Sequence, residues 1–156
     1  MTLNSALQIG SEVPDFELPN QFGEKVKLSS FRGVKNVVVV FFPFAFTGTC
    51  TGELCALRDD ISLFQNEKVE LLAISCDAMF TQKVFAEKEG YQFPLLSDFW
   101  PHGKVASQYG VLLEERDHGQ HVLRILRGKG LDHRAAQRQQ FHQPKHYQYQ
   151  GLELCY

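Results

Sequence analysis

Two cysteines, Cys50 and Cys55, lie five residues apart with Gly52 between them. The thiolate is the reactive form of cysteine, so a cysteine becomes a nucleophile or a redox centre where its surroundings favour negative charge. In an ideal helix the two Cα atoms would be ~8.7 Å apart, whereas a disulfide needs roughly 4.4–6.8 Å. We therefore expect this pair to form a disulfide only after the turn between them unwinds, which Gly52 makes easier. The alternative is that both cysteines are small buried apolar residues.

The segments on either side of Cys50 predict that it lies at the start of a helix. The run Val37–Phe42 is apolar throughout, which is typical of a strand buried on both faces. Beyond Cys50, apolar residues recur at spacings of three and four and predict a helix that ends at about Phe64. These residues are Leu54, Leu57, Ile61 and Phe64. Unpaired backbone N–H groups and the positive end of the helix dipole favour a thiolate in the first turn.

Further elements alternate along the first 115 residues. Residues 10–35 have the alternation and turn residues of a hairpin, with a turn or short helix at Ser29–Gly33. The remaining expected elements are a buried strand at Val69–Ser75, a helix at Thr81–Gly90 with Thr81 as a possible N-cap, an apolar stretch at Phe93–Ser97 and a short helix at Gly103–Tyr109. Strands that alternate with helices predict an α/β domain over residues 1–115, with a mostly parallel central sheet flanked by helices.

The composition changes after residue 115. Residues 1–115 contain 9 Lys and Arg against 15 Asp and Glu, whereas residues 116–156 contain 7 against 3, and five of the six His. Only Val122–Leu126 has the pattern of a strand there. We expect residues 116–156 to be a polar, basic tail that is weakly structured or that replaces the usual last elements of the fold. His142 and His146 do not predict a metal site, because Pro144 lies between them and disfavours a helix.

Length and charge narrow the class of protein. With 156 residues and a net charge of −2, the chain is expected to form one domain that does not bind nucleic acid. No apolar stretch approaches the ~20 residues that span a membrane, and residues 1–5 do not resemble a signal peptide, so we expect a cytoplasmic protein. The four cysteines do not have the spacing of a zinc site or a secreted disulfide framework. We expect neither a metal nor an organic cofactor.

The pattern Pro43-x3-Thr47-x2-Cys50 resembles the active-site signature of the peroxiredoxins, which are thiol peroxidases of the thioredoxin fold. Three longer blocks are also similar to that family, the last two to its alkyl hydroperoxide reductase E branch: Gly10–Leu18, Phe41–Cys50 and Phe93–Gly103. The resemblance covers about residues 8–115. It implies a thioredoxin-like α/β fold and an enzyme that reduces hydrogen peroxide or organic hydroperoxides with thiol equivalents.

The resemblance also implies roles for individual residues. Cys50 would be the peroxidatic cysteine, whose thiolate attacks the terminal peroxide oxygen and becomes a sulfenic acid. Thr47 would hydrogen-bond the thiolate and orient the peroxide, and Pro43 would shield the pocket. The pocket residues would be Phe44, Phe46 and Trp100. Without the family pattern, Thr47 is equally a turn or N-cap residue, Pro43 a strand terminator and Trp100 an aromatic residue that anchors its loop.

Cys55 matches a second pattern, because peroxiredoxin Q and bacterioferritin-comigratory-type enzymes carry a resolving cysteine at this position. The resemblance implies that the Cys50 sulfenic acid condenses with Cys55 after local unwinding. Thioredoxin, a mycoredoxin-like protein or a low-molecular-weight thiol would then reduce the disulfide. If Cys55 does not take part, an external thiol resolves the sulfenic acid directly. Relatives often form homodimers, so the same is possible here.

The tail departs from the family, which supplies an arginine from a later strand to stabilise the thiolate. By spacing from Gly110, that arginine would fall at His121, and neither Arg116 nor Arg124 matches. We interpret the change as a reading-frame shift near residue 116 in the gene or its record, with a genuine variant tail as the alternative. Two other functions stay open, a catalytically inactive thioredoxin-fold module and a thiol–disulfide oxidoreductase; the missing Cys-x2-Cys motif disfavours the second.

Overall fold

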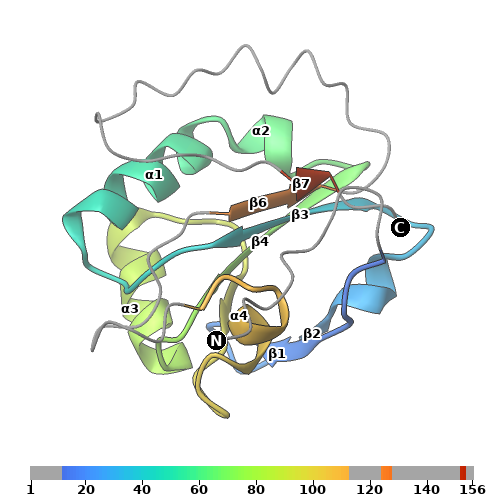
Figure 1. The fold of residues 1–156 in the computed structure, drawn as a ribbon. Coiled ribbons are helices and arrows are strands. Elements are labelled where there is room, and N and C mark those ends of the chain that lie inside the picture. Colours follow the sequence, from blue (N-terminus) through green and yellow to red (C-terminus); the bar gives the residue numbers. More distant parts are fainter. Residues whose placement is uncertain (1–11, 113–123, 128–151, 154–156) are drawn as a thin grey trace.

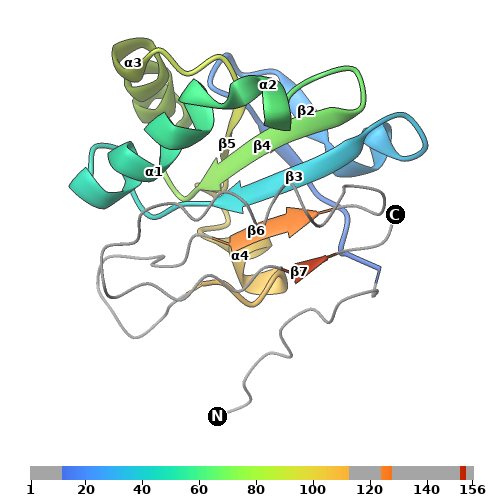
Figure 2. The same ribbon diagram turned by 90° about the horizontal axis from the view of Figure 1, so that it is seen from above.

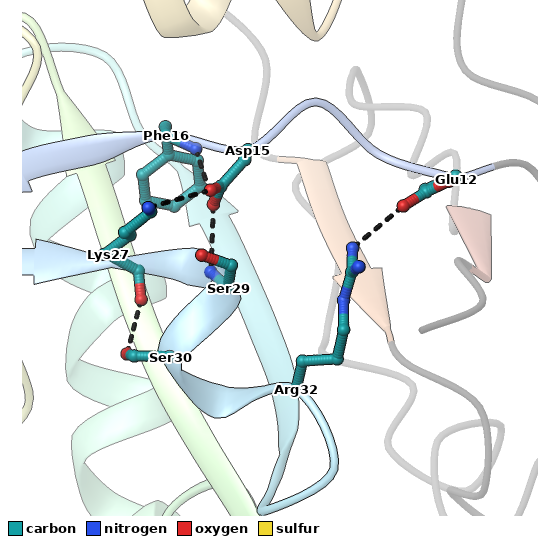
Figure 3. A network of polar contacts seen from close by, with 7 residues as sticks. All are labelled: Glu12, Asp15, Phe16, Lys27, Ser29, Ser30 and Arg32. Carbon is teal, nitrogen blue, oxygen red and sulfur yellow. Dashed lines mark hydrogen bonds and ion pairs between the residues drawn. The ribbon is translucent and has the colours of Figure 1, made fainter.

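The computed structural model describes residues 12–112, 124–127 and 152–153. The described chain opens with an antiparallel hairpin of β1 (Glu17–Pro19) and β2 (Lys25–Lys27), followed by a 3-10 turn, η1 (Leu28–Phe31). This confirms the hairpin that the sequence predicts over residues 10–35. The carboxylate of Asp15 stabilises the corner, because its Oδ1 atom accepts hydrogen bonds from the backbone N–H groups of Phe16 (3.0 Å) and Ser29 (2.9 Å) (Figure 3).

The central sheet has five strands in the order β5-β4-β3-β6-β7 (Figure 2). The innermost strand, β3 (Asn36–Phe41), pairs in parallel with β4 (Val69–Ser75), which pairs in parallel with β5 (Leu95–Ser97). On its other side β3 pairs antiparallel with β6 (Arg124–Arg127), and β7 (Leu152–Glu153) follows β6 in parallel. Apolar strands at the centre of the sheet are expected, because both of their faces are covered.

Four helices flank this sheet: α1 (Gly48–Asp59), α2 (Ile61–Phe64), α3 (Met79–Glu89) and α4 (Lys104–Gln108). Figure 1 shows α1 and α2 above the sheet, and α4 with the β1–β2 hairpin below it. The helix α3 packs on the same face as α1, since both contribute to one hydrophobic cluster. The sequence-predicted α/β architecture is therefore confirmed for the described residues.

The alternation of side chains along the strands divides the core into two clusters. One face of β3 packs against the hairpin and α4, through residues such as Val39, Phe41 and Tyr109. The other face packs against α1 and α3, with Val40, Leu57 and Phe85 among its buried residues. The α1 face matters for function, because it fixes the helix that contains Cys50.

Three boundaries differ from the sequence predictions. The helix expected from Cys50 to Phe64 is interrupted at Asp60, whose backbone leaves the helical region at φ −103° and ψ 23°. Thr81 is not an N-cap, because α3 begins two residues earlier with Ala78 in the cap position, whereas the predicted stop at Gly90 is confirmed. The strand expected at Val122–Leu126 is found at Arg124–Arg127. The expectation that His142 and His146 do not hold a metal lies outside the described residues.

Candidate functional site

The carboxyl ends of the three parallel strands lie at one edge of the sheet, because β3, β4 and β5 run in the same direction. The segments that leave these ends are residues 42–47, 76–78 and 98–103. Ligand and catalytic sites of open α/β sheets gather at this edge. Pro43, Thr47 and Trp100 all fall within these three segments.

The first of these loops is fixed by two hydrogen bonds. The Thr47 hydroxyl donates to the Phe44 carbonyl at 3.0 Å, and the backbone N–H of Ala45 donates to Asp77 Oδ2 at 2.8 Å. Phe46 has a left-handed backbone with φ 66°, a conformation that costs a non-glycine residue about 1 kcal/mol. Its ring packs on Phe85 with centroids 5.0 Å apart, which offsets that cost.

Asp77 connects all three loops at this edge. Besides Ala45, its Oδ2 atom accepts a hydrogen bond from the Ser75 hydroxyl at 2.8 Å, and its carbonyl accepts one from the Ser97 hydroxyl at 2.6 Å. Burial raises the pKa of the Asp77 carboxyl, and the hydrogen bonds from Ala45 and Ser75 lower it in part. Because Asp77 lies in the loop after β4 and bonds both the loop after β3 and the last residue of β5, it ties these three strand ends together.

The helix α1 starts directly after this loop, with Thr47 in the N-cap position at φ −83° and ψ 140°. Cys50 is the third helical residue, so the sequence prediction that it lies in the first turn is confirmed. Within this described helix the first turn contains no acidic residue. A helix of 12 residues has its full dipole at this end, which favours an anion there.

The three aromatic residues proposed for the pocket lie on two of these loops. Phe44 is partly buried, whereas Phe46 is 47% exposed and Trp100 is 83% exposed. Phe99, next to Trp100, is 53% exposed as well. This edge of the described structure therefore presents apolar rings at the surface on both sides of the sheet's carboxyl end.

Cys55 lies farther along α1 and is partly buried. Its Sγ atom is 3.9 Å from Glu89 Oε2 and 3.7 Å from the Tyr91 hydroxyl. One turn later, Arg58 donates from Nη1 to the Glu89 carbonyl at 2.6 Å and pairs with Asp59 at 2.9 Å. Arg58 therefore joins α1 to the residue that also contacts Cys55.

Cys76 is a core residue, with 2% of its surface exposed. Burial, and then the carboxylates of Asp98 and Asp77, raise the pKa of its thiol to about 12. A thiol with that pKa stays protonated at neutral pH and is a poor nucleophile. A Cβ atom at Gly103 would come within 3.3 Å of its sulfur, which shows how tightly it is enclosed.

Sequence reasoning missed Asp77, Glu89 and Tyr91 as site residues. A weak indication of Asp77 was present in the sequence. A carboxylate two residues after a buried strand, at the carboxyl edge of the sheet, needs hydrogen-bond donors nearby. Glu89 and Tyr91 carried none, since they reach Cys55 from 34 and 36 residues away in the chain.

Two classes of feature are absent from the part of the chain that the structure describes. No helix there is both long and apolar enough to cross a membrane. The same residues contain no group of three or more His, Cys, Asp or Glu side chains placed to hold a metal ion.

Comparison with known proteins gives consistent matches. Residues 9–146 match the AhpC/TSA family. The alkyl hydroperoxide reductase E of Mycobacterium tuberculosis (strain ATCC 25618 / H37Rv) is 50% identical over 109 residues, which cover 70% of this chain and 71% of that protein. The peroxiredoxin Bcp of Escherichia coli (strain K12) is 42% identical over 105 residues, or 67% of this chain and 65% of that protein. The crystal structure of peroxidoxin BcpB from Mycobacterium tuberculosis superposes with a TM-score of 0.67 at 35% identity, covering 78% of this chain and 79% of that one.

Proposed function

This chain belongs to the AhpC/TSA family and is a thiol-dependent peroxidase, and from that premise we propose that Cys50 is the cysteine that peroxide oxidises. The observation that supports this role most directly is its place in the helix. Cys50 is the third residue of a 12-residue helix whose described first turn has no acidic residue, at the carboxyl edge of β3. Unpaired N–H groups and the helix dipole lower the pKa of a thiol at such a position.

The proposed first step is nucleophilic attack on the peroxide. The Cys50 thiolate attacks the terminal peroxide oxygen, the O–O bond breaks, and the departing oxygen leaves as water or an alcohol after it takes up a proton. Cys50 is oxidised to the sulfenic acid and the peroxide is reduced. Thr47 would orient the peroxide through its hydroxyl, and Pro43, which has no N–H group, would leave the pocket apolar at that point.

The second step resolves the sulfenic acid. Cys55 is the proposed resolving cysteine, with an external thiol as the alternative. A disulfide between Cys50 and Cys55 would be reduced by thioredoxin, a mycoredoxin-like protein or a low-molecular-weight thiol, which restores both thiols. The cytoplasm is the compartment in which such reductants keep thiols reduced. Assembly as a homodimer is also part of this proposal, by analogy with relatives.

The arginine that the family supplies to stabilise the thiolate has no counterpart at the expected position, where the spacing from Gly110 places His121. We therefore expect peroxide reduction to be slower than in relatives that have this arginine.

The test of the first step is stopped-flow peroxide reduction by the wild type and by Cys50→Ser. We expect the variant to lose turnover completely, while Cys76→Ser, at the enclosed cysteine, keeps the ability to reduce peroxide. Alkylation of Cys50 as a function of pH should show a pKa below ~8.5, the value of a free thiol. A wild-type protein with a neutral, unreactive Cys50 would refute the assignment.

The proposed preference is for organic hydroperoxides over hydrogen peroxide. The exposed rings of Phe46 and Trp100 suit organic hydroperoxides, since apolar contacts add affinity for the organic group that hydrogen peroxide lacks. Phe46→Ala and Trp100→Ala should raise KM for an aryl hydroperoxide severalfold and leave KM for hydrogen peroxide nearly constant. Equal changes in KM for both peroxides would show that Phe46 and Trp100 do not contact the organic group of the substrate.

A further inference from the structure

Cys55 packs against the hydrophobic cluster on the α1 face, and it also contacts two polar groups from a second element of the fold. Its Sγ atom donates to Glu89 Oε2 at 3.9 Å and lies 3.7 Å from the Tyr91 hydroxyl. Glu89 is the last residue of α3, and Tyr91 follows directly after Gly90. A partly buried thiol that is an inert core residue would have apolar neighbours only. Here a proton acceptor and a hydroxyl are both within reach of its sulfur.

The two polar groups have complementary properties. A carboxylate accepts the proton of a thiol, whereas a phenol donates to the thiolate that results. Burial, followed by the hydrogen bond with Cys55, raises the pKa of the Tyr91 phenol well above its ordinary value of 10. Tyr91 therefore keeps its proton at physiological pH and stays a hydrogen-bond donor. Its ring is held by Phe93, stacked at 5.1 Å, and by Phe85, edge-on at 5.2 Å.

Arg58 contacts the group formed by Cys55, Glu89 and Tyr91 from the α1 side. Arg58 is three residues after Cys55, so the two side chains lie on neighbouring positions of one helix face. The Arg58 guanidinium donates to the Glu89 carbonyl at 2.6 Å and thereby ties α1 to the end of α3. The position of Glu89 relative to Cys55 is consequently fixed by the packing of two helices.

The two halves of α1 differ in the burial of their described residues. Leu54 and Leu57, which flank Cys55, have 0% and 2% of their surface exposed. Gly48 and Gly52, in the half that contains Cys50, are exposed, and a Cβ atom at Gly52 would meet nothing within 4 Å. Since an intact helix keeps the two cysteines ~8.7 Å apart, the Cys50 half must move to reach Cys55.

We propose that Glu89 and Tyr91 activate Cys55 as the nucleophile that resolves oxidised Cys50. This inference rests on the proposed function of Cys50. Glu89 accepts the proton of the Cys55 thiol, and the Tyr91 hydroxyl donates to the sulfur as negative charge develops. The Cys55 sulfur attacks the sulfenic sulfur of Cys50, the S–S bond forms and the S–O bond breaks. The departing hydroxide takes up the proton and leaves as water. The two electrons that the peroxide accepted have then come from the two thiols, which are now joined as the disulfide.

The experiment follows the two oxidised forms of the full-length protein after one equivalent of hydrogen peroxide. Samples are quenched over time, and mass spectrometry measures dimedone-labelled Cys50 sulfenic acid and the 50–55 disulfide. In Glu89→Gln we expect disulfide formation to slow about tenfold relative to sulfenic acid formation, and in Tyr91→Phe severalfold. The matched control is Glu87→Gln, at an exposed position of the same helix. Unchanged ratios in both variants would overturn the proposal.

A second readout of the same samples separates activation from a loss of packing. The rate of sulfenic acid formation at Cys50 should keep its wild-type value in Glu89→Gln and in Tyr91→Phe. A rate that falls in parallel with disulfide formation would show that the substitutions act on the fold, and would contradict activation of Cys55 by these groups.

The same data separate this inference from the proposed function. Wild-type protein that forms no sulfenic acid at Cys50 would refute the proposed function itself. Wild-type protein that forms a persistent sulfenic acid, with no 50–55 disulfide, would leave that function intact and refute the activation of Cys55.

Discussion

The two halves of α1 differ in how they are held. The first half contains two exposed glycines, Gly48 and Gly52, whereas the second half is anchored by Leu54 and Leu57 in the core. Arg58 adds a hydrogen bond from this second half to the end of α3. Stability is therefore concentrated in the half that contains Cys55, and the freedom to rearrange in the half that contains Cys50. A peroxidase that forms a disulfide within one helix needs both properties.

The largest effect is expected in the anchored half. Leu57→Ala should lower the free energy of unfolding by about 3 kcal/mol, because it removes a fully buried side chain and leaves a cavity between α1 and the sheet. Urea denaturation followed by circular dichroism measures this change. Asp59→Ala, at an exposed position two residues later, is the control and should change stability by less than about 1 kcal/mol. Similar losses in the two variants would mean that the second half is not the anchor.

Asp77 should have the next largest effect, because it fixes the loop that leads into the first half. Asp77→Ala removes the acceptor of Ala45 N–H and of the Ser75 hydroxyl and should cost about 2 kcal/mol of stability. Both bonds go to Oδ2, so Asp77→Asn can keep them with its amide oxygen and should be at least as stable as wild type at pH 7. Peroxide reduction should fall in the first variant and persist in the second. A loss of stability in Asp77→Asn as large as in Asp77→Ala would show that the charge matters more than the hydrogen bonds.

Gly52→Ala stiffens the half that is proposed to unwind. The new methyl group meets nothing within 4 Å, and the helix should gain about 1 kcal/mol because alanine has the higher helix propensity. If unwinding precedes resolution, formation of the 50–55 disulfide should slow about fivefold. Quenched-flow mass spectrometry measures that rate, and the rate of sulfenic acid formation in the same samples is the internal reference. Faster disulfide formation would contradict the assignment of the mobile half.

The smallest effect is a dependence of stability on pH. Burial raises the pKa of the Asp77 carboxyl above its ordinary value of 3.8. For a raised folded-state pKa, the stabilising contribution is fully present below pH 3.8 and is lost as the pH rises through the folded-state pKa. The unfolding free energy of wild type, measured relative to Asp77→Asn, should therefore decrease as the pH rises from 3.8. An increase of the unfolding free energy with pH would show that folding lowers the pKa of Asp77 rather than raising it.

The candidate site was partly predictable from local sequence. The apolar run Val37–Phe42 and the spacing of Leu54 and Leu57 are enough to place Cys50 where a strand is followed by a helix, because burial patterns depend on near neighbours in the chain. The interruption at Asp60 and the start of α3 at Met79 were not predicted. At the second of these, the Gln82 side chain is buried and bonds the Ser75 hydroxyl and the Leu96 carbonyl, contacts that local propensity does not contain.

After residue 115, local sequence predicted less of the structure than it did before that point. Its composition predicted little structure apart from one strand, and β6 was found two residues from the predicted position, paired with β3. The register of that pairing, which puts Arg124 opposite Phe41, could not be obtained by counting from Gly110. Whether residues 116–156 arise from a shifted reading frame is a question for the coding DNA, and an uninterrupted frame in a functional gene would exclude the shift.

By itself, the sequence determined the order of strands and helices and the position of Cys50 at a helix start, because both follow from the periodicity of apolar residues over short distances. Only the tertiary structure brought Asp77 to the loop before that helix, and Glu89 and Tyr91 to Cys55. Hydrogen bonds of a few ångströms depend on how distant segments pack, and no local pattern of residues encodes that packing.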